Sequence, residues 1–187
     1  HAVLFDYAAM NDGSTTDERI DIKQELSGIN EFKVVMFSHA HDDHTKGASE
    51  FFYLDHASKY QSEDRAKINE LWVSSAFLLE TAKIIRNEAR YRLKEGYGVK
   101  IIADPDSLSS WLEAQEIEYD DIKHLIVHAG ETVEVDGATD EVQFFVHAPF
   151  SEDSEEVQDK NDPSIVLQMR LFNNDRETNI LITGDTP

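Results

Sequence analysis

Residues 34–47 read VVMFSHAHDDHTKG, an apolar run followed at once by three of the chain's eight histidines and two aspartates. The run is rich in β-branched and aromatic residues, which favours a strand that ends just before the first histidine. In extended backbone His39 and His41 point to the same side, because side chains alternate along a strand. They can therefore chelate one cation, and Asp43 and His44 can face a second cation beside it if the chain turns.

A metal at such a site must use nitrogen and oxygen ligands, because the chain contains no cysteine. Imidazole and carboxylate ligands suit zinc best, and they are also compatible with manganese or iron. The alternative interpretation is a polar loop with exposed histidines. The order of these residues directly after an apolar strand favours the metal site.

Length and composition indicate one domain over residues 1–187, with 40% hydrophobic residues to build its core. The formal net charge is −21, which disfavours binding of nucleic acid through a broad basic surface. No apolar run approaches the ~20 residues of a membrane-spanning helix, and the first residues lack the pattern of a signal peptide. We expect a soluble, cytoplasmic protein without a membrane span.

Strand-like apolar runs alternate with a helical pattern along the chain. Residues 75–95 repeat aliphatic residues at spacings of three and four, which predicts an amphipathic helix. The segment NNDRE, residues 173–177, predicts a hairpin connection. This mixed order predicts an α/β fold in which helices cover the sheets. The predicted strands are residues 2–7, 33–38, 71–74, 124–127, 142–146, 164–171 and 179–183.

The segment HAHDDH, residues 39–44, resembles the His-x-His-x-Asp-His signature of the metallo-β-lactamase fold superfamily. Two further segments resemble that superfamily: VLFDY, whose strand ends at Asp6, and NILITGD, which places Asp185 after a late strand. The resemblance implies an αββα sandwich with a metal site at one edge of the sheets. It also implies that Asp6 supports the segment of residues 39–44, the ligand loop, through hydrogen bonds and that Asp185 bridges two metals.

Within that superfamily, FVHAP followed by NDPSIVLQ and then ILITGD is most similar to the metallo-β-lactamase-like domain of competence-type DNA-uptake proteins and its free-standing relatives. This narrower resemblance implies hydrolysis of a phosphoester or another anionic substrate rather than of a β-lactam. A small molecule or a phosphoester is therefore the expected partner.

Two departures from the family pattern affect the metal site. Most members place a third histidine on the first metal, whereas the corresponding turn here reads KNDPS. The alternatives for that ligand are His147 and Asp162, and we take His147 as the candidate. The family also continues to a final histidine on the second metal, whereas this chain ends at Pro187. We expect a C-terminally incomplete fold that is completed in a longer protein or in a homodimer. By itself this chain should bind the second metal weakly and show little hydrolytic turnover.

The resemblance and the ligand chemistry together predict a metal-dependent hydrolase with two zinc ions. Two adjacent cations lower the pKa of a bridging water toward ~7, and the resulting hydroxide is a nucleophile that needs no serine or cysteine. Asp43 is the predicted catalytic residue, because it would also accept a hydrogen bond from that nucleophile. The alternative is a non-catalytic relative that keeps the fold for binding or assembly, with a degenerate metal site. The predicted metal ligands are His39, His41, Asp43, His44, His147 and Asp185.

Overall fold

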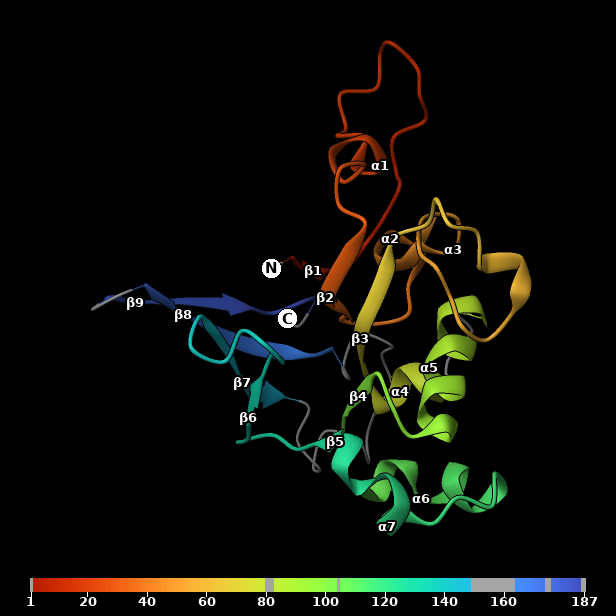
Figure 1. The fold of residues 1–187 in the computed structure, drawn as a ribbon, viewed down its shortest axis with the longest axis vertical. Helices are drawn as coiled ribbons and strands as arrows, with labels where there is room; N and C mark the ends of the chain where they lie inside the picture. Colours follow the sequence, from red (N-terminus) through yellow and green to blue (C-terminus); the bar gives the residue numbers. More distant parts are fainter. Residues whose placement is uncertain (1, 80–82, 104, 149–163, 174–175, 186–187) are drawn as a thin grey trace.

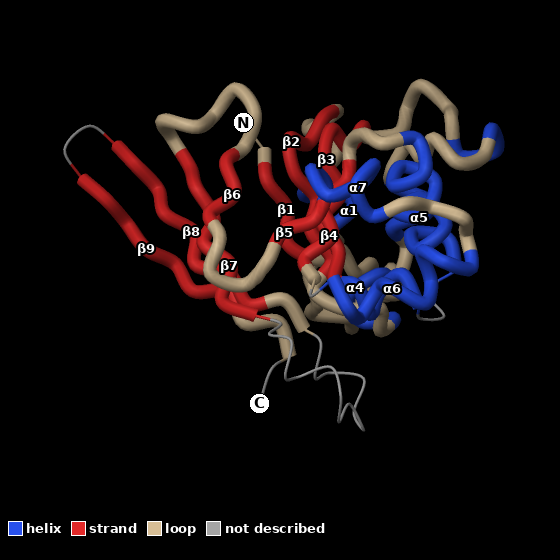
Figure 2. Tube along the Cα trace, turned by 90° about the horizontal axis from the view of Figure 1, so that it is seen from below, coloured by secondary structure: helices blue, strands red, loops and turns tan. Residues whose placement is uncertain are grey.

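A computed structural model describes residues 2–79, 83–103, 105–148, 164–173 and 176–185 (Figure 1). These residues form two β-sheets and a set of helices. The first sheet lies in the middle, the helices pack on one of its faces, and the second sheet lies on its other face (Figure 2). The predicted α/β class is confirmed.

The first sheet contains five parallel strands in chain order, β1-β2-β3-β4-β5. Parallel neighbours require crossover connections, and here the crossovers place the helices on one face. The middle strands are therefore buried on both faces, which explains why β2 and β3 end in continuous apolar runs. The bounds are β1 Val3–Phe5, β2 Glu31–Phe37, β3 Lys67–Ser74, β4 Val99–Ile102 and β5 Ile126–Val127.

Most of the helices between these strands are short, and α5 is the longest. Its residues Ile85, Ala89 and Leu93 recur every four positions and are buried against the first sheet. No described helix combines the length and the apolar composition that crossing a lipid bilayer requires. The α-helices are α1 Ile22–Glu25, α2 Asp42–Thr45, α3 Ala48–Phe51, α4 Ser75–Leu79, α5 Lys83–Glu95, α6 Pro105–Ala114 and α7 Tyr119–Ile122, and the 3-10 helices are η1 Ser58–Tyr60 and η2 Lys123–Leu125.

The second sheet is an antiparallel meander in the order β6-β7-β8-β9. Along β7, Val142, Phe144 and Val146 are buried, and the residues between them face outward. The buried side chains pack against Met36 and Trp72 of the first sheet, so a second core lies between the two sheets. The bounds are β6 Thr132–Glu134, β7 Val142–Ala148, β8 Val166–Asn173 and β9 Arg176–Ile182.

Several predicted elements differ from the structure in extent. The helix predicted for residues 75–95 is described as α4 and α5, and residues 80–82 lie outside the described part. The strand predicted for residues 124–127 is too long, because its first two residues belong to η2. The predicted hairpin joins β8 to β9, with residues 174–175 outside the described part. Within the described ranges no helix packs on the outer face of the second sheet (Figure 2).

A buried charge network ties α5 to the loop that follows α3. The fully buried Glu88 accepts hydrogen bonds from the backbone N–H groups of Asp55 and His56, from His56 Nδ1 and from Arg92 Nε. Burial raises the pKa of Glu88, but the charge and the hydrogen bond of Arg92 outweigh burial, so the pKa lies below its ordinary value. The network therefore holds the loop that follows α3 in one place against α5.

Replacing Glu88 by glutamine removes the buried carboxylate at Arg92 Nε and leaves Arg92 paired with the part-exposed Asp55 at 3.1 Å, which should cost up to about 3–5 kcal/mol of unfolding free energy at neutral pH. The carboxylate stabilises the fold above the pKa of an unfolded glutamate, ~4.3, and this contribution is lost as the pH falls through the lower folded pKa. Urea unfolding at about pH 7 and pH 3 should therefore show that the difference between wild type and Glu88→Gln shrinks in acid.

The matched control is Glu95→Gln, which changes an exposed glutamate on the same helix. This control should change the unfolding free energy by less than about 0.5 kcal/mol at either pH. A loss in Glu88→Gln as small as that of the control would show that the network does not hold the fold.

Candidate metal centre

The ligand loop begins at the edge where the strands of the first sheet end. Because Phe5 of β1 pairs with Met36 of β2, Asp6 and Ser38 meet just beyond the two strand ends. The second sheet reaches the same corner, because the backbone N–H of Ile165 donates to the Ser38 carbonyl oxygen at 3.3 Å. β9 runs antiparallel to β8, and its end brings Asp185 to this corner.

Two groups of side chains have ligand atoms that all lie within 4.8 Å of one another. One group is His39, His44 and Asp185, and the other is His39, His41 and Asp43. All predicted ligands except His147 therefore come together. The grouping differs from the expected pairing of Asp43 with His44, although Asp43 Oδ2 also lies 3.7 Å from His44 Nε2.

The two ligand groups combine a buried imidazole with exposed carboxylates. The side chain of His39 is 2% exposed, whereas that of Asp185 is 41% exposed. Asp185 Oδ2 lies 3.3 Å from His44 Nε2 and 3.7 Å from His39 Nε2. Two ligands that are each about 2.1 Å from a tetrahedral ion lie about 3.4 Å apart, so this spacing fits one shared cation.

The buried atom His39 Nε2 has no hydrogen-bond partner among the described residues. Buried polar atoms in folded proteins are nearly always paired, so this nitrogen needs a partner. It faces a carboxylate and lies within reach of further imidazole and carboxylate ligands. This donor set fits a divalent cation such as zinc.

Asp6 holds the ligand loop from behind. Its backbone has a φ of 54°, a left-handed conformation that aspartate tolerates better than most residues. Its Oδ1 accepts the Ser38 backbone N–H at 2.7 Å, and its Oδ2 accepts the Ser38 hydroxyl at 2.7 Å and His44 Nδ1 at 2.8 Å. The expected supporting role of Asp6 is confirmed.

The two inner histidines have opposite pKa shifts. Burial lowers the pKa of His39, and the neighbouring His44 lowers it further. Burial also lowers the pKa of His44, but the hydrogen bond and charge of Asp6 and the charge of Asp185 outweigh burial and raise it above its ordinary value. Burial thus disfavours a second proton on the ring of His39, whereas Asp6 and Asp185 favour one on His44, where it would compete with a cation.

His147 lies outside both ligand groups. It is at an irregularity of β7, its ring lies against Phe145, and its Nε2 is 3.2 Å from Gln168 Oε1. Phe145 alternates with the buried residues of β7, so this side of the strand faces away from the core between the sheets. The prediction that His147 supplies the third ligand therefore lacks support from the geometry. The alternative ligand Asp162 lies outside the described residues.

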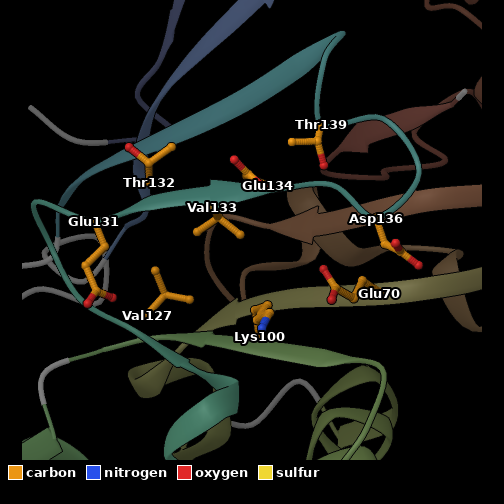
Figure 3. A pocket seen from close by; sticks show the side chains of 9 residues that line it. All are labelled: Glu70, Lys100, Val127, Glu131, Thr132, Val133, Glu134, Asp136 and Thr139. Carbon is orange, nitrogen blue, oxygen red and sulfur yellow. The ribbon is translucent and has the colours of Figure 1, made fainter.

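A cavity of about 630 Å³ lies between β3 and β4 of the first sheet and β6 of the second. Figure 3 shows the side chains that line it, which include Lys100 and the carboxylates of Glu70, Glu131 and Asp136. The cavity shares no residue with the two ligand groups. It is therefore distinct from the candidate metal centre.

Protein-family models and curated proteins contain no match to this chain. The family resemblance therefore rests on the motifs in the sequence. Function has to be argued from the side chains at the site and their chemistry.

Two residues that shape the centre do not stand out in the sequence, Ser38 and Gly184. Gly184 has a φ of +54°, and a Cβ atom there would lie 3.1 Å from Ser38 Cβ and 3.4 Å from Ser164 Cβ. Only glycine therefore allows the turn before Asp185 to approach the end of β2 so closely. The Thr-Gly-Asp sequence indicates a turn, but it does not indicate what the glycine packs against.

Gly184→Ala should lower the unfolding free energy by more than the left-handed backbone alone costs, which is about 1–2 kcal/mol. The added methyl group must also displace Ser38, and such crowding costs about 1–3 kcal/mol. The matched control is Gly137→Ala, because Gly137 has a φ of +72° and nothing within 4 Å of the added Cβ. Urea unfolding of both variants measures the difference, and equal losses would contradict the close approach.

Proposed function

We propose that this chain is a metal-dependent hydrolase whose centre is built by His39, His41, Asp43, His44 and Asp185. The observation that carries the proposal is the buried His39 Nε2, which has no hydrogen-bond partner in the described part of the chain. An unpaired buried polar atom costs about 1–3 kcal/mol, and a cation would pair it. The ligand chemistry favours zinc, with manganese or iron as alternatives.

The same proposal includes the metallo-β-lactamase fold. In chain order, Asp6 follows β1, HAHDDH follows β2, and Thr-Gly-Asp follows β9. These three segments meet at one corner of two stacked sheets. Their order and convergence support the αββα sandwich that the resemblance implies, although the described helices cover only one of its faces.

A divalent cation held at this centre would supply a Lewis acid and a water of lowered pKa. Asp43 has a side chain that is 60% exposed, so its carboxylate lies where substrate would enter and can accept the proton of an attacking water. Asp185 lies near both His39 and His44, so its carboxylate would help to hold the cation. The histidines would provide nitrogen ligands, and His39 is buried on the inner side of the centre.

The proposed substrate is a phosphoester or a comparably anionic molecule. The resemblance to the competence-type domains supports this class over β-lactams. The cations would also give the site a local positive charge in a chain whose formal net charge is −21. Such a focus of charge attracts an anion that the rest of the surface repels.

A second candidate is a binding or assembly protein that holds a single ion. It is favoured by one observation, which is that both ligand groups use His39. The Nδ1 atom of His39 lies against Ser38, so only its Nε2 is available as a ligand atom. The described ligands can then surround one ion, whereas two ions would have to share the remaining side chains.

Zinc binding tests the centre independently of activity. We expect the chain to bind zinc in competition with a chromophoric chelator, and we expect His39→Ala to weaken binding by at least about 100-fold, because even residues behind direct ligands contribute about 10–100-fold. The control His128→Ala should leave zinc affinity unchanged, because His128 is bonded through its backbone N–H. Unchanged zinc affinity in His39→Ala would contradict the proposed centre.

Assays of hydrolysis distinguish the two candidate functions. We expect zinc- or manganese-dependent turnover of bis(4-nitrophenyl) phosphate, loss of that turnover in Asp43→Asn, and no turnover of the β-lactam nitrocefin. One zinc per chain without phosphodiester hydrolysis would favour the binding protein. Hydrolysis of nitrocefin alone would contradict the proposed substrate class.

A further inference from the structure

The rings of His39 and His44 are joined by one chain of hydrogen bonds that ends on Asp6. The Ser38 hydroxyl oxygen lies 2.7 Å from Asp6 Oδ2 and 3.1 Å from His39 Nδ1. The same carboxylate oxygen lies 2.8 Å from His44 Nδ1. Ser38 and His39 are both buried, so water does not compete for these contacts.

The direction of each hydrogen bond follows from the groups involved. An ionised carboxylate only accepts, so the Ser38 hydroxyl gives its single proton to Asp6. Its oxygen is then left as an acceptor, and His39 Nδ1 must carry the proton that it receives. His44 Nδ1 donates directly to Asp6 by the same argument. The contact of 3.4 Å between the Ser38 hydroxyl oxygen and His44 Nδ1 is longer and therefore secondary.

Fixing both protons on Nδ1 leaves both Nε2 atoms with a free lone pair, because a neutral imidazole carries one ring proton. These two Nε2 atoms lie 3.7 Å and 3.3 Å from Asp185 Oδ2, within one ligand group. The hydrogen-bond chain thus prepares the two nitrogen atoms that a cation would meet.

We propose that Ser38 is a positioning residue whose hydroxyl links His39 Nδ1 to the Asp6 carboxylate. Through this link and its direct bond to His44, Asp6 selects the Nδ1–H tautomer of both imidazoles. The role of these tautomers in holding a cation rests on the proposed function. Groups that orient metal-binding histidines typically change metal affinity by about 10–100-fold when they are removed. Ser38 therefore contributes to affinity without touching the cation.

Ser38→Ala removes the hydroxyl group and keeps the backbone and Cβ atom of the residue. The backbone N–H of Ser38 still donates to Asp6 Oδ1, and its carbonyl oxygen still accepts from Ile165. The variant keeps these backbone bonds and only removes one side-chain oxygen, so it should fold. The link between His39 and Asp6 is lost, together with the longer, secondary contact of the hydroxyl with His44 Nδ1.

The matched control is Ser164→Ala. Ser164 is fully buried, packs beside Gly184 at the same corner, and has a hydroxyl without a hydrogen-bond partner in the described part of the chain. This variant therefore removes a buried hydroxyl from the same neighbourhood without breaking a described hydrogen bond. A general effect of losing a serine hydroxyl there would appear in both variants.

The experiment is nitrogen-15 NMR of the histidine rings in the metal-free chain at about pH 9, where imidazoles are neutral. In the wild type, His39 and His44 should both show the Nδ1–H tautomer. In Ser38→Ala, His39 should become a mixture of tautomers while His44 keeps its proton on Nδ1. In Asp6→Asn, both rings should change, and in Ser164→Ala neither should.

Zinc affinity provides the second measurement. Ser38→Ala should bind zinc about 10-fold or more weakly, and Ser164→Ala should bind as the wild type does. An unchanged His39 tautomer in Ser38→Ala would overturn the inference whether or not zinc binds. The expected tautomer changes in a chain that binds no zinc would support the tautomer assignment and overturn the proposed function, so the two failures are distinguishable.

Discussion

The candidate centre depends on one carboxylate at the junction of two parallel strands. Asp6 follows β1 and accepts hydrogen bonds from the backbone and the hydroxyl of Ser38, which follows β2, and from the ring of His44. These bonds fix where the ligand loop leaves the sheet, and they fix how its histidines face. The sheet makes this possible, because the ends of parallel neighbours lie at the same edge. The left-handed backbone of Asp6 turns its carboxylate into that position.

Much of the first sheet could be predicted from the sequence, because its central strands are covered on both faces and therefore read as apolar runs. The run at residues 33–38 is confirmed as β2. β4 was missed, because it is only four residues long and owes its place to β3 and β5 on either side. The strand expected at residues 124–127 was too long, because only Ile126 and Val127 find partners in β4.

The candidate site could be predicted only where it is local in the sequence. The spacing of His39 to His44 indicates ligands without reference to the rest of the chain. The place of His147 depends on which face of β7 points into the core, and the run of apolar residues at 142–146 does not reveal that face. The contact of Ser38 with Gly184 joins residues that are far apart in the chain, and no pattern in either segment indicates it.

Asp185 follows β9, an exposed strand at the margin of the second sheet in the described part of the chain. Within the described part of the chain β9 pairs only with β8, and all its residues except Ile182 are exposed. Edge strands of this kind open locally at a lower free energy than central strands do. Such an opening of β9 would carry Asp185 away from the corner, whereas the hydrogen bonds of Asp6 to Ser38 and His44 do not involve β9. The candidate centre would then consist of a fixed half and a detachable half, and fraying at the margin of the second sheet would set the residence time of any ion held there.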